Sequence, residues 1–361
     1  MKLLSVEKWH HAIFSVEMCV IMTVCAVACC PEKPDAERVE QNDMQCRAVV
    51  QTQWGDGPGE LGYVPNDQST PCLHIPSRFQ VDEAGGIYVA DTLNTRILEF
   101  STAGKLVKSF DVPIPTAGNC IVDLAARGNR IVVATRDDVY VFDENDDSVK
   151  VLHPPKEAGA CAMSGEGKSV QIDGEGNVYT CVLGLGWEGP GPGGTVLQFD
   201  REGSSHEFFV GQFDHVIVGW DGTVHIQQLY CGEGSMEGSG SHYEDDCVVK
   251  LDSEGNQVDK VIIRGSNLAD AGLSHSGLLI GVDTRGNLYG STVSGMKEGT
   301  LVSKSAFVQV DSQGEIVRVI ERDISPLVDT TVVDKEGNLY WFRFGEIPSE
   351  PAEIWSCKPG K

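Results

Sequence analysis

Six polar side chains stand just before or within segments of alternating apolar residues, and together they carry the groups that hold a hard metal ion. Carboxylates, amide oxygens and imidazoles that converge from separate loops could hold calcium, which takes oxygen ligands in this way. The alternative is that these side chains line a water-filled channel, where His215 is hydrogen-bonded and not a ligand. The six metal-site candidates are Asn119, Asp123, Asp214, His215, His275 and Asp329.

A second set of aromatic, acidic and imidazole side chains lies in or beside long insertions between strand-like segments. Three insertions stand out, at residues 184–194, 232–246 and 291–305. Binding residues concentrate on loops carried by a rigid scaffold. The alternative is that the insertions are variable, solvent-facing loops. The ligand-binding candidates are Trp187, Glu188, Tyr230, Glu233, His242 and Tyr243.

A repeat indicates how the chain could bring these residues together. Turns of the type Asp-x-x-Gly-Asn, each followed by a strand-like segment, occur at residues 173–177, 283–287 and 334–338. Gly and Asn accept the left-handed backbone of a tight reversal, and Asp hydrogen-bonds its own turn. These turns also resemble fragments of calcium loops, but they lack the ligands that should follow, so we interpret them as turns. Units of roughly 40 to 60 residues with four strands each predict a β-propeller.

The end of the repeat predicts how the ring closes. Six units are visible, and the sixth stops after its third strand. Residues 47–54, before the first unit, have the pattern of the missing strand. The sequence therefore predicts an all-β, six-bladed β-propeller over residues 46–361, closed by an N-terminal strand that completes the last blade. The long insertions then come from consecutive blades 3, 4 and 5 and project from one face, while the Asp-x-x-Gly-Asn turns lie on the other.

The first unit carries a family resemblance. Residues 86–89, Gly-Ile-Tyr-Val, followed by residues 90–97, Ala-Asp-Thr-Leu-Asn-Thr-Arg-Ile, closely resemble the NHL repeat of six-bladed propellers. The full motif stands only in this blade, where we expect Asp91, Asn94 and Arg96 to fix the loop by hydrogen bonds. The family hosts many functions, and six-bladed relatives include lyases and lactone hydrolases with a metal at the channel. Their catalytic residues cannot be matched here position by position.

The N-terminus predicts export. A segment with two lysines precedes eleven uncharged, mostly apolar residues (18–28), and small residues at Ala26 and Ala28 precede Cys29. This arrangement is typical of a signal peptide over residues 1–28 and is too short to span a bilayer comfortably. Residues 26–29 also resemble a bacterial lipobox, with Cys29 as the lipidation site, although Ala26 replaces the usual Leu. Residues 29–45 are predicted to be a flexible tether.

Eight cysteines follow the signal region, an even number that favours disulfides in an exported chain. In the closing blade the end of the third strand lies beside the start of the fourth, so Cys46 should meet Cys357. Metal–thiolate sites are the alternative, but no Cys-x-x-Cys pair exists in this region. The other predicted pairs are Cys231 with Cys247, Cys161 with Cys181, and Cys72 with Cys120.

Charge and composition narrow the function. The chain carries 53 acidic and 28 basic residues, a formal net charge of −25, so it would repel phosphate backbones and nucleic acid is not expected as a partner. We expect a monomeric recognition module, secreted or held in the cell envelope by a lipid anchor, that binds an extracellular or periplasmic protein, peptide or small molecule. The alternative is a metal-dependent lyase or lactone hydrolase. A structural role is a third reading, and no Ser/His/Asp or HExxH pattern is present.

Overall fold

The computed structural model describes residues 37–40, 45–63, 76, 78–114, 120–135, 138–145, 148–154, 159–160, 170–183, 193–213, 215–228, 245–271, 277–297, 300–322, 331–344 and 348–358. The predicted signal peptide and Cys29 lie outside these residues. Within them, no helix combines the length and the apolar character needed to cross a membrane.

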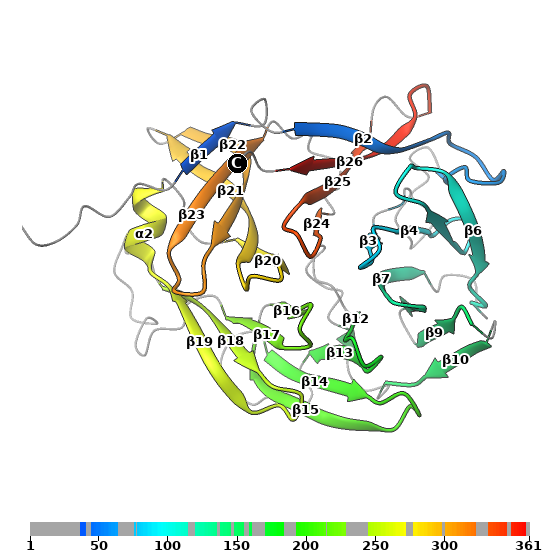
Figure 1. Ribbon diagram of the computed structural model, residues 1–361, viewed down its shortest axis with the longest axis horizontal. Coiled ribbons are helices and arrows are strands. Elements are labelled where there is room, and N and C mark those ends of the chain that lie inside the picture. The colour runs from blue at the N-terminus through cyan, green and yellow to red at the C-terminus, as the bar shows by residue number, and fades with distance from the viewer. Residues whose placement is uncertain are drawn as a thin grey trace, which may run out of the picture. The chain divides into compact units, whose positions relative to one another are not determined.

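The described residues from Glu37 onward form six sheets that follow one another around a common centre, and the four blade strands of each sheet are antiparallel (Figure 1). The innermost strands are β3, β7, β12, β16, β20 and β24. The sequence prediction of a six-bladed β-propeller is confirmed. The strands of the first three blades are β3 (Phe79–Val81), β4 (Ile87–Asp91), β5 (Arg96–Phe100) and β6 (Leu106–Asp111); β7 (Ile121–Arg127), β8 (Arg130–Thr135), β9 (Val139–Asp143) and β10 (Ser148–Leu152); and β12 (Val170–Ile172), β13 (Val178–Leu183), β14 (Gly193–Phe199) and β15 (Ser205–Gln212).

The other three blades repeat this arrangement, and three short elements are added to the ring. Blade 6 takes its outermost strand, β2, from the beginning of the described chain. The strands are β16 (His215–Val218), β17 (Val224–Gln228), β18 (Asp246–Leu251) and β19 (Gln257–Ile263); β20 (Leu278–Val282), β21 (Leu288–Lys297), β22 (Thr300–Val310) and β23 (Ile316–Arg322); and β24 (Thr331–Val333), β25 (Leu339–Phe344), β26 (Ala352–Lys358) and β2 (Gln45–Thr52). The added elements are β1 (Glu37–Glu40), β11 (Gly159–Ala160) and α2 (Gly265–Asp270).

The recurring turn forms because one carboxylate satisfies several donors. In blade 3 the Asp173 Oδ1 atom accepts the N–H groups of Glu175 and Asn177 at 2.9 and 2.8 Å, while Gly176 takes a φ of +87°. The Asp173 Oδ2 atom accepts the Asn177 amide at 2.8 Å and the Tyr179 hydroxyl at 3.0 Å. Blades 5 and 6 repeat these bonds around Asp283 and Asp334. These carboxylates are engaged by protein donors, which confirms that the motif is a turn.

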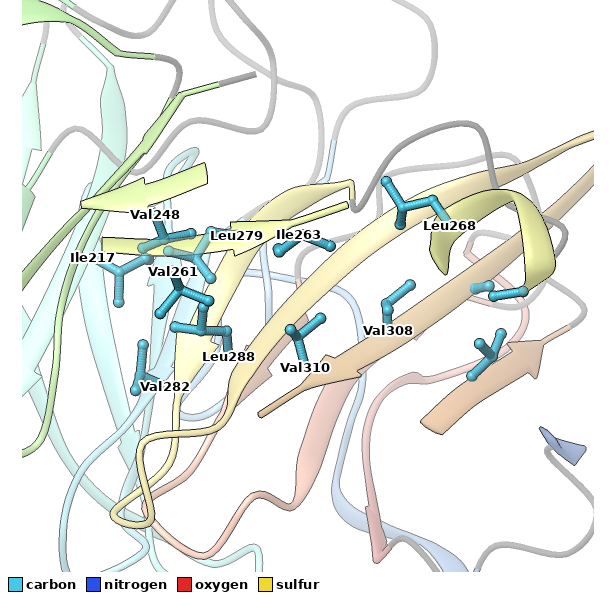
Figure 2. Close-up of a cluster of buried hydrophobic side chains, with 13 residues drawn as sticks. Ile217, Val248, Val261, Ile263, Leu268, Leu279, Val282, Leu288, Val308 and Val310 are labelled. Carbon is cyan, nitrogen blue, oxygen red and sulfur yellow. The ribbon is translucent and has the colours of Figure 1, made fainter. Parts of the chain in front are cut away.

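Apolar side chains fill the spaces between neighbouring blades. Between blades 4 and 5, Ile217 and Val261 pack against Leu279 and Leu288, and Leu268 of α2 joins the same cluster (Figure 2). These side chains are at most 3% exposed. Successive side chains of a strand point to opposite faces of its sheet, so each blade packs against the blade before it and the blade after it. The stability of each blade therefore depends on both neighbouring blades.

The N-terminal strand closes the ring as the sequence predicts. β2 pairs antiparallel with β26, with Cys46 opposite Cys357, and a disulfide joins these two residues. Buried Val50 of β2 and Ile354 of β26 belong to one apolar cluster with residues of blade 1. The prediction of both the closing strand and its disulfide is confirmed.

One part of the predicted tether is wrong. Residues Glu37–Glu40 are not a tether but strand β1, which pairs in parallel with β23 at the outer edge of blade 5. The register places Glu37 opposite Arg318 and Val39 opposite Ile320. An outer strand offers unpaired backbone groups, and β1 occupies those of β23. The short, mostly charged sequence Glu-Arg-Val-Glu gave no strand signal of its own.

The NHL-like motif of blade 1 holds the connection between blades 6 and 1. Asp91 is fully buried and accepts the Gly62 N–H at 2.9 Å, the Asn94 amide at 2.8 Å and the Arg96 guanidinium at 2.9 Å. Arg96 also donates to the Glu60 carbonyl at 2.7 Å, among other carbonyls of residues 56–60. The prediction that these three motif residues fix the loop by hydrogen bonds is confirmed.

We expect Asp91→Ala to lower the free energy of unfolding by about 3–5 kcal/mol, because it leaves the Arg96 guanidinium buried without its carboxylate. Urea unfolding followed by tryptophan fluorescence would measure the loss. The matched control is Asp259→Ala, which removes an exposed carboxylate 3.8 Å from Lys250 and should cost less than about 1 kcal/mol. Equal losses for the two variants would refute this role of Asp91.

Candidate functional site

Two of the six metal-site candidates lie among the described residues. Asp123 of β7 is 1% exposed; its carboxylate accepts the Val170 N–H at 2.9 Å and lies 3.8 Å from the Arg78 guanidinium. It therefore links blades 2 and 3 and pairs with a cation from blade 1. His215, the first residue of β16, is 4% exposed. The described residues contain no group of three or more His, Cys, Asp or Glu side chains placed to hold a metal.

The remaining four metal-site candidates lie outside the described residues, so the calcium site stays a prediction. The same holds for all six ligand-binding candidates in the first two insertions. The residues outside the described part are Asn119, Asp214, His275 and Asp329, and Trp187, Glu188, Tyr230, Glu233, His242 and Tyr243.

The third insertion is not a loop. Residues 291–305 continue strands β21 and β22, which stay paired as far as Lys297 opposite Thr300. The inner strand β20 begins at Leu278, opposite Ser291. Strands β21 and β22 therefore extend beyond β20, at the end of the blade away from the 283–287 turn. The β-branched residues Thr292, Val293, Thr300 and Val302 favour strands, and the register shift between Ser294 and Met296 marks a bulge. We call this element the blade 5 hairpin.

Sequence reasoning missed Arg127, which lies among the inner strands at the end of the blades away from the blade 5 hairpin. Arg127, at the end of β7, is 8% exposed and donates to the carbonyls of Ile172, Gly219 and Trp220 at 3.2, 3.0 and 2.7 Å. Its Nε atom lies 2.8 Å from a carboxylate oxygen of Glu83, and its guanidinium stacks 5.1 Å from the Trp220 ring centre. One side chain thus joins blades 1, 2, 3 and 4.

The pKa of Glu83 fits this contact. Burial works to raise the pKa of this carboxyl, but the Gly128 N–H and the Arg127 guanidinium hold it below its usual range. The channel beside Arg127 leaves a cavity of about 30 Å³, lined by residues of all six inner strands, including Gln80, Gln171 and Gly281. A cavity of this volume has room for a few water molecules. A sequence signal for Arg127 did exist: blade 2 lacks the Asp turn and has Arg-Gly-Asn instead.

Blade 4 departs from the repeat at the same end. Gly219 stands where blades 3, 5 and 6 have the turn aspartate, and His225 stands where they have the tyrosine. The His225 Nε2 atom lies 2.9 Å from the Thr223 hydroxyl, and the side chain is 2% exposed. Burial, and then the charge of Lys250, lower the pKa of His225 to about 4 from its ordinary value of 6.5.

We expect His225 to make the stability of the chain depend on pH. Between pH 6.5 and about 4 the unfolded state binds a proton on this imidazole and the folded state does not, so acidification favours unfolding. The contribution is complete above pH 6.5 and falls by about 3 kcal/mol as the pH approaches 4. Urea unfolding at several pH values should show a smaller slope for His225→Gln than for the native chain, and an unchanged slope for His206→Gln, an exposed histidine. Parallel slopes for all three proteins would contradict the expectation.

The remaining cysteines are partly described. Cys120 and Cys181 are each disulfide-bonded, and their predicted partners Cys72 and Cys161 lie outside the described residues. Cys247 is fully buried in β18, with its Sγ atom 3.5 Å from the Gln228 side-chain oxygen. Its predicted partner Cys231 also lies outside the described residues, so these three pairings stay predictions.

Comparison with known proteins yields likeness of shape only. No family model matches the chain, and no curated protein matches its sequence. Similar solved structures include a calcium-binding protein, regucalcin, from Agrobacterium tumefaciens str. C58 (12% identity, 90% of this chain and 97% of that chain, TM-score 0.48). Virginiamycin B lyase from Staphylococcus aureus (11%, 86% and 87%, 0.43) and a luciferin-regenerating enzyme (11%, 79% and 91%, 0.46) are also similar. At these identities and TM-scores the likeness assigns no activity to this chain.

Proposed function

We propose that this chain is an exported, NHL-like β-propeller that recognises a protein, peptide or small-molecule ligand through one face of blades 3, 4 and 5. The observation that carries the proposal is the length of the connection between the second and third strands of each blade. In blade 4 this connection runs from Gln228 to Asp246, and in blade 5 it is drawn out into the blade 5 hairpin. In blade 1 it is the four-residue turn 92–95.

The position of these connections favours recognition. In an antiparallel blade the first-to-second-strand turn lies at one end, and the second-to-third-strand connection lies at the other end. The three long connections should therefore share one face of the ring. Their blades are consecutive, and we propose that the three connections together form one surface, which we call the decorated face. The rest of the ring supplies a rigid support, a common arrangement for binding loops.

The cysteines support export. Cys46 and Cys357 are bonded to each other, and Cys120 and Cys181 are also in disulfides. Such bonds persist in oxidising compartments and are rare in the cytosol. Together with the signal-like residues 1–28, they support secretion or, through Cys29, a lipid anchor in the cell envelope. We propose a monomer, because recognition by the decorated face needs no second copy.

The test is a pair of loop-shortened variants. In the first, residues 232–244 are replaced by a short Gly–Ser connection; in the second, the same replacement is made at residues 345–347 of blade 6. Biotinylated protein is applied to arrays of peptides and glycans and to intact cells. We expect the first variant to lose the binding of the native chain and the second to retain it. Loss by both, or by the blade 6 variant alone, would overturn the proposal.

The alternative is a metal-dependent lyase or lactone hydrolase at the channel mouth. The observation in its favour is that Asp123 and His215 are both buried in the beginnings of inner strands. Metal analysis of the purified chain, beside the variants Asp214→Asn and Asp329→Asn, separates the two functions. A stoichiometric metal that both variants lose would favour the enzyme. Absence of metal together with specific binding would favour recognition.

A further inference from the structure

A groove between blades 5 and 6 has the size of a small-molecule site. Its volume is about 600 Å³, within the range of roughly 300–1,000 Å³ that ligand pockets occupy. The turns 283–287 and 334–338 form its rim, so it opens at the opposite end of the blades from the blade 5 hairpin. It is therefore independent of the decorated face. We call it the blade 5–6 groove.

Positive charge distinguishes this groove from the rest of the chain. Three basic side chains, Arg285, Arg318 and Lys358, and one acidic side chain, Glu336, line it. The whole chain has the opposite balance, with 28 basic and 53 acidic residues. The Glu336 carboxylate lies 3.9 Å from the Lys335 ammonium group, and Arg285 is itself paired with Asp283 at 2.7 Å, so the described side chains in and beside the groove keep a small positive balance. An anion is thus better accommodated here than over an average part of the surface.

Arg285 is positioned and still accessible. Its Nε and Nη2 atoms donate to Asp283 Oδ2 at 3.1 and 2.7 Å, which fixes the plane of the guanidinium. The side chain is nevertheless 66% exposed, and its Nη1 atom takes no part in that ion pair. A fixed, planar guanidinium with a solvent-facing edge suits a carboxylate.

The floor of the groove is polar and rigid. Tyr289 and Gln309 line it and are 1% and 7% exposed, and they lie opposite each other in the pairing of β21 with β22. The Tyr289 hydroxyl donates to Asp283 Oδ2 at 3.1 Å, whereas an amide such as that of Gln309 both donates and accepts hydrogen bonds, as ligand hydroxyl groups do. The two rim turns are tied together because the Thr284 N–H and hydroxyl both donate to the Lys335 carbonyl at 3.0 Å. A site that needs little ordering on binding keeps more of its interaction energy.

From this lining we propose that the blade 5–6 groove binds a small carboxylate that bears several hydroxyl groups, such as a sugar acid. Val317 is the only large apolar side chain among the described residues of the lining, which disfavours a fatty acid or another aliphatic ligand. A monatomic or inorganic anion would leave most of the volume and the polar floor unused. The basic side chains bind the carboxylate, and the Gln309 amide binds the hydroxyl groups.

The experiment is calorimetric titration of the full chain with galacturonate, with galactose as the neutral match and sodium sulfate as the inorganic anion. Two variants probe the groove: Lys358→Glu reverses an exposed charge, and Val317→Trp narrows the volume without changing the charge. The control is Lys105→Glu, which makes the same charge change at an exposed position in the β5–β6 turn. Circular dichroism confirms that each variant is folded.

We expect galacturonate to bind and galactose and sulfate to bind at least tenfold more weakly. Lys358→Glu and Val317→Trp should each weaken galacturonate binding at least threefold, and Lys105→Glu should leave it unchanged. Higher salt should weaken binding, because the groove charges are partly exposed. Absence of galacturonate binding, equal binding of sulfate, or an equal loss in Lys105→Glu would each overturn the proposal.

Discussion

Removal of the Cys46–Cys357 disulfide should lower the free energy of unfolding by about 5 kcal/mol. This bond joins residues 311 positions apart, so it restricts nearly the whole unfolded chain, and the loop-entropy estimate for so long a loop is about 5 kcal/mol. The two cysteines also pair β2 with β26, the contact that completes the ring. The double variant Cys46→Ser/Cys357→Ser, unfolded in urea beside the native chain, measures the loss.

The control for this variant uses the neighbouring pair of residues. Gln45 lies opposite Lys358 in the same two strands, and the double variant Gln45→Ser/Lys358→Ser alters the strand ends without touching the crosslink. It should change the stability by less than about 1 kcal/mol, since both side chains are exposed. A loss below about 1 kcal/mol in the cysteine variant, or peptide mapping that pairs Cys46 with another cysteine, would contradict ring closure by this bond.

Arg127→Met should lower the free energy of unfolding by about 4 kcal/mol. The substitution keeps much of the side-chain volume but removes the donors to three backbone carbonyls and the partner of Glu83. A buried polar group left without its hydrogen-bond partner costs about 1–3 kcal/mol, and the carbonyls of Ile172 and Gly219 would both lose theirs. The Glu83 side chain is 36% exposed, so the loss of its ion pair adds less. The bonds involved span blades 1 to 4, so the loss should appear as reduced stability of the whole ring in urea.

A surface arginine serves as the control for Arg127. Arg343 is 63% exposed, lies 4.0 Å from Glu353 and stacks 5.1 Å from the Trp355 ring centre, so Arg343→Met removes an ion pair and a cation–π contact at the surface. Its cost should stay near or below 1 kcal/mol. If Arg343→Met cost as much as Arg127→Met, the arginine across the channel would have no special role.

Local signals in the sequence predicted most of the fold. The turn at residues 173–177 carries its own hydrogen-bond partners within five residues, so its geometry can be inferred without knowing its neighbours. The same applies to Asp91, Asn94 and Arg96, which contact one another within one loop. Ring closure was predictable because a missing strand in the last unit must come from elsewhere in the chain.

The features that sequence reasoning missed depend on contacts between distant segments. β1 forms because the edge of β23, more than 270 residues away, is available to it. Arg127 meets carbonyl groups of blades 3 and 4, which carry no sequence signal because every residue has a carbonyl. The blade 5–6 groove likewise combines Arg285 and Lys358, which only the assembled ring brings to one site.

Function was harder to predict, for a related reason. The repeat defines a scaffold, whereas the candidate ligand residues Trp187 and Tyr243 lie in insertions where the repeat is interrupted. No pattern within an insertion shows which side chains meet. The blade 5 hairpin illustrates the point, since residues 291–305 contain several β-branched residues and nevertheless resemble a loop by their place in the repeat.

Site-specific photo-crosslinking tests the central claim, recognition by the decorated face, most directly. A benzophenone amino acid is placed at residue 187, between β13 and β14, or at residue 243, between β17 and β18. The controls carry it at residue 105 in the β5–β6 turn or at residue 149 in β10. The protein is then irradiated in its native cell envelope or extracellular medium. We predict specific adducts from residues 187 and 243 only. Adducts from residues 105 and 149 alone, or equal adducts from all four positions, would contradict recognition by blades 3 to 5.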